Sequence, residues 1–387
     1  MRFTNFLRTA AITALAASLL AGTAAAAETR ISGPHIHENL AVYLVHGASA
    51  AGPVPLTLQE ALAKDAVRVI ETGSVNELQI ENTGTEDVFI QAGDIVKGGR
   101  QDRVLTMSLL LAPGSGKLGI GAFCVEQGRW AARGTEDVKR FASANKSIPS
   151  REAKLAMALP AKPAPTGAFA GVLPASEPRA LRGVLAGDGV AQGAHAGHGE
   201  QMAAADTSTR QREVWDKVKR TQDKLSGNLG AAVAAPQSAS SLQLSLENGR
   251  LEQAQKTYVA ALQPAAEKDT DVVGYVVAVN GKLASADVYP SNGLFRKMWA
   301  KQLNASVTEA IGEKSGAKTE GQAAAPIASA PAIDAVEAFL AAAEKGTANE
   351  RVVAGRMKVQ TRDADQALLV EASRPDGRLV HRNYLAK

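Results

Sequence analysis

The 387-residue sequence contains a single cysteine, Cys124, and few aromatic side chains, which make up 4% of the residues. One cysteine cannot form an intramolecular disulfide, so the fold must be stabilised by a packed core. The motifs His-Glu-x-x-His, Cys-x-x-Cys and Gly-x-Ser-x-Gly are also absent. These absences exclude, at the level of motifs, zincin-type metalloproteases, paired-cysteine metal centres and the nucleophile elbow of α/β-hydrolases.

Neither sign of charge dominates the sequence. Lys and Arg number 43 and Asp and Glu number 39, so the formal net charge is +4. Loss of an N-terminal segment carrying Arg2 and Arg8 would leave +2. A chain so close to neutral has no field strong enough to favour nucleic acid. We therefore expect no nucleic acid partner.

No apolar run reaches the roughly 20 residues that a membrane-spanning helix requires. The apolar stretch at residues 10–20 follows Arg2 and Arg8 and precedes the small residues at 25–27. This order is typical of a secretory signal peptide, here residues 1–27, with a mature chain that begins at Glu28. An uncleaved anchor is the alternative, but the run is short for one. The sequence predicts a periplasmic or secreted protein with no transmembrane span after cleavage.

Residues 28–149 predict a β-rich part, arranged as a meander or a sandwich-like sheet. Thr57 and Glu60 have the spacing of a capping box, which predicts a short helix there. Alternating or continuous apolar residues predict the strands, which we place at 40–45, 67–71, 77–81, 87–91, 104–111 and 118–126.

The rest of the chain predicts mostly helices and hairpins. Residues 150–209 are rich in loop and linker composition, and the His-x-x-His pair of His195 and His198 in them is by itself a weak signal for a metal site. Residues 210–312 predict a helix–hairpin–helix part. In it, the helical stripes lie at 210–229, 251–265 and 291–311, and Asn280-Gly281 turns the hairpin.

Residues 313–331 have the composition of a low-complexity linker, and residues 332–387 predict a C-terminal helix and β-hairpin. This tail either adds strands to the main sheet or forms a small subdomain. The expected fold class is α+β, with a β-rich N-terminal sheet packed against the helix–hairpin–helix part.

The segment of residues 87–130, which we name the signature block, concentrates charged side chains in strand-like runs. The period-two pattern from Val104 to Leu111, extended backwards, places Arg103 and Gln101 on the face of the leucines. Buried polar groups there must find partners or line a cleft. Alternatively, the strand begins at Val104 and residues 98–101 form a solvated loop.

Residues 118–126 form the expected partner strand, with Cys124 and Glu126 on one face. Pairing in register would bring Gln101 and Arg103 close to Glu126. Guanidinium groups suit anions, a carboxylate suits hydroxyl groups, and an indole offers a stacking surface. The candidate ligand-binding residues are therefore Gln101, Arg103, Cys124, Glu126, Arg129 and Trp130. A structural Arg–Glu pair with Trp130 in the core is the alternative.

The runs GDIVKGGRQDRV and FCVEQGRW resemble the ARG and rhodanese-phosphatase-superfamily-associated protein domain, a family of uncharacterised function. The resemblance is specific over about residues 67–130 and continues to about Val307. By resemblance, the signature positions of the family fall on Gly98, Gln101, Arg103, Cys124, Glu126, Arg129 and Trp130. The family name records genomic association with ADP-ribosylglycohydrolase and rhodanese-like or phosphatase-like proteins. It implies no activity of its own and, by association alone, a nucleotide-like or ADP-ribose-like ligand.

Three functions are consistent with these features. The first is a non-enzymatic module that binds or senses a small polar or anionic ligand. The second is a hydrolase or transferase with Glu126 as general acid/base, Arg103 and Arg129 as anion clamps and Cys124 as nucleophile. The third is a structural envelope protein. No motif identifies a cofactor, a metal or a protein partner.

Overall fold

The structure is a computed structural model, and it describes residues 29–134, 138–159, 198–314 and 329–387. These residues form seven α-helices and seventeen strands in three sheets. The structure thus confirms a mixed α+β class that is rich in β-structure. The expected signal peptide, His195 and most of the linker at 313–331 lie outside the described residues.

The helices at 249–262, 292–312 and 333–344 lie close to the predicted positions, whereas those at 151–158 and 242–246 were not predicted. The predicted capping box is confirmed, because the Thr57 hydroxyl accepts from the Glu60 amide at 3.2 Å and Glu60 accepts from the Thr57 amide at 2.8 Å. The elements are α1 (Leu58–Ala63), α2 (Arg151–Ala158), α4 (His198–Leu229), α5 (Leu242–Leu246), α6 (Gly249–Leu262), α7 (Asn292–Gly312) and α8 (Ile333–Glu344), with short 3-10 turns η1 (Gln263–Ala266) and η2 (Ala354–Arg356).

Helix α4 corrects one prediction. Residues 198–209 were expected to be loop, yet α4 starts at His198. The glutamate, glutamine and alanines of this segment favour a helix, and their effect adds to that of the amphipathic stripe that follows. None of the described helices is both long and apolar enough to cross a membrane.

An eight-stranded antiparallel sheet joins the two ends of the chain. Its strand order is β1 (Arg30–His37), β2 (Leu40–His46), β12 (Val272–Val279), β13 (Lys282–Val288), β17 (Leu379–Ala386), β16 (Ala367–Ser373), β15 (Met357–Asp363) and β14 (Thr347–Val353). Because β17 pairs with β13, the C-terminal tail adds strands to this sheet, which decides between the two predicted arrangements. Strand β14 was not predicted, since most of its residues are exposed and carry little apolar signal.

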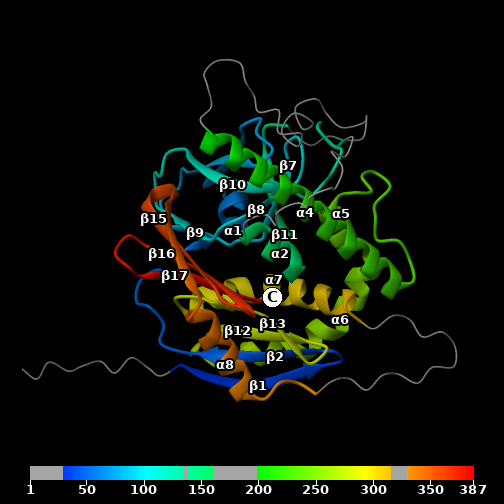
Figure 1. Ribbon diagram of the computed structural model, residues 1–387, viewed down its shortest axis with the longest axis vertical. Coiled ribbons are helices and arrows are strands. Elements are labelled where there is room, and N and C mark those ends of the chain that lie inside the picture. Colours follow the sequence, from blue (N-terminus) through cyan, green and yellow to red (C-terminus); the bar gives the residue numbers. More distant parts are fainter. Residues whose placement is uncertain (1–28, 135–137, 160–197, 315–328) are drawn as a thin grey trace, which may run out of the picture.

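The central strands of this sheet are buried on both faces. In β2, Leu40, Val42 and Leu44 belong to one apolar cluster together with α7, and the alternating Ala41, Tyr43 and Val45 belong to a second with α8. Period-two alternation sends successive side chains to opposite faces. Figure 1 shows α7 between this sheet and the smaller sheets, with α8 on the outer face. In the β12–β13 hairpin, Asn280 and Gly281 both have positive φ, as a type I′ turn requires.

Two smaller sheets carry the signature block. The six-stranded sheet has the order β11 (Phe141–Ser147), β7 (Asp94–Gly98), β8 (Arg103–Leu105), β10 (Leu118–Cys124), β5 (Glu77–Asn82) and β4 (Val67–Glu71). The three-stranded sheet has the order β3 (Leu56–Thr57), β6 (Val88–Ile90) and β9 (Leu109–Leu111).

Two strand predictions in this region were wrong. The expected single strand at 104–111 is two strands in different sheets. Thr106 still bonds to Gly121 of β10, the partner of β8, whereas the Ser108 hydroxyl contacts His381 of β17. The strand at 87–91 does not continue a meander with β5. It pairs instead with β3 and β9, which lie far from it in sequence.

Candidate functional site

The structure brings the six predicted ligand-binding residues together at one end of the six-stranded sheet. Antiparallel pairing of β8 and β10 sets Cys124 opposite Arg103. The Gln101 amide donates to the Glu126 carbonyl at 3.1 Å, as the predicted register implies. Four of the residues are completely buried and Trp130 is half-buried, whereas the Arg129 side chain is 12% exposed. The strand starts at Arg103, with Gln101 buried in the preceding turn.

Two buried carboxylates, Asp102 and Glu126, form a cluster with Arg129 and Arg133, which we name the charge cluster. Arg129 donates to Glu126 at 2.6 Å and lies 3.3 Å from Asp102. Arg133 lies 2.9 Å from Asp102 and 3.3 Å from Glu126. The sequence did not predict Asp102 or Arg133 as members. Each carboxylate contacts both guanidinium groups, so the charges of the four side chains balance.

Electrostatics in the charge cluster differ from those of a surface ion pair. Burial raises the pKa of Asp102, and the neighbouring Glu126 carboxylate raises it further. The Arg133 guanidinium and the Gly98 amide oppose this shift without cancelling it. Ser241 on the far side also donates to Asp102 at 3.2 Å. Asp102 thus accepts hydrogen bonds from two arginines, a backbone amide and a hydroxyl group.

A glycine turn joins the charge cluster to the strand β7. Asp102 accepts from the Gly98 amide at 3.0 Å, and Arg129 donates to the Gly99 carbonyl at 3.4 Å. Gly99 has a φ of +56°, and a Cβ placed on it would lie 2.2 Å from the Phe141 ring. Both the backbone conformation and the close approach of Phe141 require glycine here.

We expect Gly99→Ala to destabilise the protein by about 2–4 kcal/mol, the sum of left-handed backbone strain and overpacking against Phe141. Gly114→Ala is the matched control, because Gly114 has a similar φ of +61° with no atom within 4 Å of the added Cβ. Urea unfolding of both variants measures the difference. Equal losses in the two variants would show that Phe141 does not constrain the turn.

Cys124 is buried among polar groups that hold its backbone. Gln211 of α4 accepts from its amide and donates to its carbonyl, both at 2.9 Å. The thiol donates to the Glu126 carbonyl at 3.1 Å. Burial raises the pKa of Cys124 to about 11, although Arg103 opposes the shift. A thiol that holds its proton at neutral pH is a poor nucleophile.

We expect iodoacetamide at pH 8 to leave Cys124 unmodified in the folded protein. With a pKa of about 11, roughly one thiol in a thousand is ionised at that pH, against roughly a quarter for an ordinary cysteine. Intact-mass measurement over time, with and without guanidinium chloride, makes the comparison. Rapid alkylation of the folded chain would contradict the assigned burial and pKa.

Among the described, completely buried candidate residues, Arg103 is the one with side-chain nitrogens that lack a hydrogen bond. One guanidinium nitrogen, Nη1, donates to the backbone and the side chain of Gln101, at 3.1 and 3.2 Å. Its Nε and Nη2 are buried and have no hydrogen-bond partner among the described residues, and the same holds for Oε2 of Glu71, 3.8 Å from Nη2. The Trp130 ring covers this point, with Arg103 and Arg100 at 5.6 and 5.3 Å from its centroid.

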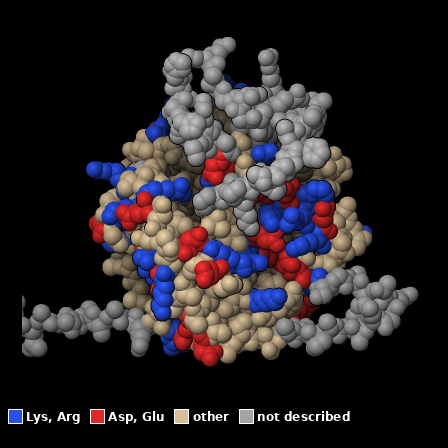
Figure 2. Space-filling view, viewed as in Figure 1, with Lys and Arg blue, Asp and Glu red and all other residues tan. Residues whose placement is uncertain are grey.

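A surface groove of about 510 Å³ runs between the edge strands β4 and β11. Part of its lining is apolar and includes Val67, Val69 and Phe141. Four cationic residues and one acidic residue also line it: Arg68, Lys97, Lys139, Arg140 and Asp65. The groove reaches Ile70 and Gly98, and the residue after Ile70 is Glu71, the neighbour of Arg103. Elsewhere both signs of charge are interspersed over the face seen in Figure 2.

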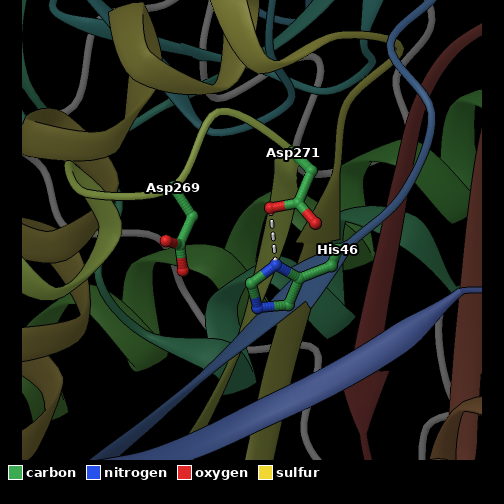
Figure 3. A group of neighbouring side chains, drawn as sticks. All are labelled: His46, Asp269 and Asp271. Atoms are coloured by element: carbon green, nitrogen blue, oxygen red, sulfur yellow. Dashed lines mark hydrogen bonds and ion pairs between the residues drawn. The ribbon is translucent and has the colours of Figure 1, made fainter.

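One group of possible metal ligands lies away from the signature block (Figure 3). His46, Asp269 and Asp271 offer ligand atoms within 4.8 Å of one another. Both ring nitrogens of His46 are already engaged, by Asp271 at 2.8 Å and by Ser32 at 2.7 Å. Asp271 also pairs with Arg30 at 3.3 Å. The group is therefore a hydrogen-bonded ion-pair network rather than an open donor set.

Comparison with known proteins gives one match. The model of the ARG and Rhodanese-Phosphatase-superfamily-associated Protein domain family matches residues 28–171 and 176–385. The match covers most of the chain, and it confirms the resemblance carried by the signature block and extends it towards the C-terminus. No curated protein and no solved structure matches the chain.

Proposed function

We propose that this chain, which belongs to the ARG and Rhodanese-Phosphatase-superfamily-associated Protein domain family, is an exported protein that binds a small polar or anionic ligand at Arg103. In this proposal Arg103 supplies the hydrogen bonds and Trp130 the stacking surface. Gln101, Cys124, Glu126 and Arg129 hold these two side chains in place.

The two Arg103 nitrogens that lack hydrogen bonds carry the proposal; Nη2 has a long ion pair with Glu71 at 3.8 Å. A buried guanidinium with two nitrogens lacking hydrogen bonds is costly, because each unmade bond of a buried charged group forfeits its desolvation energy. Such groups in folded proteins call for an explanation, often an ordered water or a bound ion. Nε and Nη2 of Arg103 present the two parallel donors that a carboxylate or phosphate accepts.

The groove between β4 and β11 supports the same ligand class. Its volume of about 510 Å³ is in the range of small-molecule sites. Its cationic lining favours an anion, and its apolar walls favour contact with the rest of a ligand. A ligand with an anionic end near Arg103 and its body in the groove would use both features.

The same residues support the two alternatives, a hydrolase or transferase and a structural envelope protein, less well. A general acid/base must exchange a proton with a substrate, whereas both carboxylate oxygens of Glu126 are engaged by Arg129 and Arg133. Cys124 has a raised pKa and no exposed surface. A purely structural role accounts for the charge cluster but not for the two Arg103 nitrogens that lack hydrogen bonds.

A thermal-shift and calorimetry screen tests the proposal. The panel contains inorganic phosphate, dicarboxylates, sugar phosphates, nucleotides and ADP-ribose. A ligand at about one hundred times its Kd should stabilise the fold by roughly 2.7 kcal/mol. Arg103→Met should abolish that shift, and Arg68→Ala in the groove should weaken it. Arg250→Ala, on the exposed face of α6, is the control and should leave the shift unchanged.

Two results would overturn the proposal. The first is a panel in which no compound stabilises the wild-type chain. The second is a ligand that binds Arg103→Met with the wild-type Kd, measured below the unfolding temperature of that variant.

The export component has its own test. Expression of the full chain in a bacterial host should give periplasmic protein whose intact mass starts at Glu28, because residues 1–27 have the pattern of a cleaved signal. Leu15→Arg should block export by placing a charge in the apolar run. Full-length protein recovered from the cytoplasm in both cases would contradict export.

A further inference from the structure

We propose that Ser108 is the nucleophile of a second site, activated by His381 and Asp287, which transfers short acyl groups from carboxylic esters. This site lies apart from Arg103 and is independent of the ligand proposed above. Its three residues come from the β8–β9 connection, from β17 and from β13.

The three side chains form a continuous chain of contacts in the protein interior. The Ser108 hydroxyl lies 3.0 Å from Nδ1 of His381. On the other side of the ring, Nε2 lies 3.1 Å from an Asp287 carboxylate oxygen, off the line of an ideal hydrogen bond. Asp287 and His381 are essentially unexposed, and Ser108 is 6% exposed. A nucleophile, a base and a group that orients the base are the parts of a catalytic triad, which geometry rather than sequence order identifies.

The hydrogen bonds around Ser108 fix the direction of its proton. The Ala92 amide donates to the Ser108 oxygen at 3.0 Å. The hydroxyl proton is then free to point at Nδ1 of His381, which accepts it when the other ring nitrogen carries the ring proton. That arrangement directs the Nε2 proton towards Asp287. The serine is therefore poised to give up its proton to the imidazole.

Asp287 is held so that it can stabilise a protonated imidazole. Tyr275 donates to it at 2.5 Å, Asn383 at 2.8 Å and Gln91 at 3.2 Å. All three donors are neutral, and among the residues that the structure describes His381 is the one basic side chain in direct contact with the carboxylate. A carboxylate fixed in this way orients the ring and stabilises the imidazolium, which makes Asp287 a positioning residue.

A small cavity opens on Ser108. Its volume is about 30 Å³, and its walls include Met107, Val359 and Leu385. A water needs roughly 10–15 Å³ by this measure, so the cavity has room for about two waters or an acetyl group. Lys154 and Arg351 also line it and offer positive charge to a developing oxyanion. The size limits the acyl group to a short one.

The reaction balances without a cofactor. The Ser108 oxygen attacks the ester carbonyl, and its proton moves to Nδ1 of His381. Collapse of the tetrahedral intermediate breaks the ester C–O bond, and the alcohol leaves with that proton. Water then attacks the acyl-serine and gives a proton to His381. His381 passes this proton to the Ser108 oxygen as the carboxylic acid leaves.

The full chain is incubated with p-nitrophenyl acetate, while p-nitrophenolate release is followed and the acetylated peptide is mapped by mass spectrometry. We expect acetyl-Ser108 in the wild type and none in Ser108→Ala. His381→Gln should slow release by at least about 100-fold. Buried controls outside the site, Ser147→Ala and His46→Gln, should behave as wild type.

Two outcomes would overturn the assignment: folded wild-type protein that neither carries acetyl on Ser108 nor releases p-nitrophenolate faster than buffer alone, or acetylation of Ser108 at an unchanged rate in His381→Gln. The first outcome does not depend on the stability of any variant, because it uses the wild-type chain alone.

Discussion

Asp102→Ala is expected to lower the free energy of unfolding by about 3–5 kcal/mol, the range found when one partner of a buried ion pair is removed. Asp102 is completely buried, and Arg129 and Arg133 both contact it. Without it, Glu126 is the remaining carboxylate of the charge cluster for two guanidinium groups. The Gly98 amide and the Ser241 hydroxyl lose their acceptor as well. Unsatisfied buried donors add to the cost.

Urea denaturation followed by circular dichroism measures this loss. Asp223→Ala is the control, because Asp223 pairs with Lys219 on the exposed surface of α4. Exposed pairs contribute about 0–1 kcal/mol. If Asp102→Ala cost no more than Asp223→Ala, the charge cluster would not be a stabilising element, and its arginines would be available to a ligand.

The features that the sequence predicted correctly depend on neighbouring residues. Asn280-Gly281 marks a hairpin because both residues tolerate positive φ, and the pairing of β12 with β13 needs no distant partner. The Thr57 capping box acts over three residues. In each case the interaction that decides the structure lies within the pattern itself.

The failures have distant causes. Thr106 and Ser108 fit the alternation of one long strand, and the partner that takes Ser108 out of that strand is His381, 273 residues later. Pairing of β2 with β12 likewise joins segments that no local pattern connects. Sequence periodicity gives the faces of a strand, but it does not give the neighbours of that strand.

In the candidate site, too, the contacts within one strand pair were predicted and those that depend on turns were not. Contact of Gln101 with Glu126 followed from strand register. Asp102 was not predicted, because an extended strand would turn it away from Gln101 and Arg103, whereas the chain turns at Gly98-Gly99. Arg133 follows the end of the strand, where no period applies. The turns of the chain therefore determine which charged side chains contact one another in the charge cluster.

Asp287→Asn is expected to destabilise the protein by about 3–5 kcal/mol at pH 7, because one amide oxygen cannot accept from all the donors that now share the carboxylate. Those donors are Tyr275, Asn383, Gln91 and His381. Gln91 directly follows β6 of the three-stranded sheet and the other three donors lie in the eight-stranded sheet, so the carboxylate connects these two sheets. Asp216→Asn, on the exposed face of α4, is the control for the substitution.

The pH dependence of the stability difference between wild type and Asp287→Asn separates the effect of the lost carboxylate charge from an effect on packing. Burial alone would raise the pKa of Asp287, but the His381 contact, Lys154 and the Tyr275 hydroxyl outweigh it, and the pKa lies below its ordinary value of 3.8. The folded chain thus binds fewer protons at this group than the unfolded chain. Its contribution to stability is complete above about pH 4 and declines as the pH falls through the folded pKa. Denaturation from pH 7 to pH 3 should therefore show the gap between wild type and Asp287→Asn narrowing only in acid. A gap that stays constant would mean that the asparagine disrupts packing and that the carboxylate charge stabilises nothing.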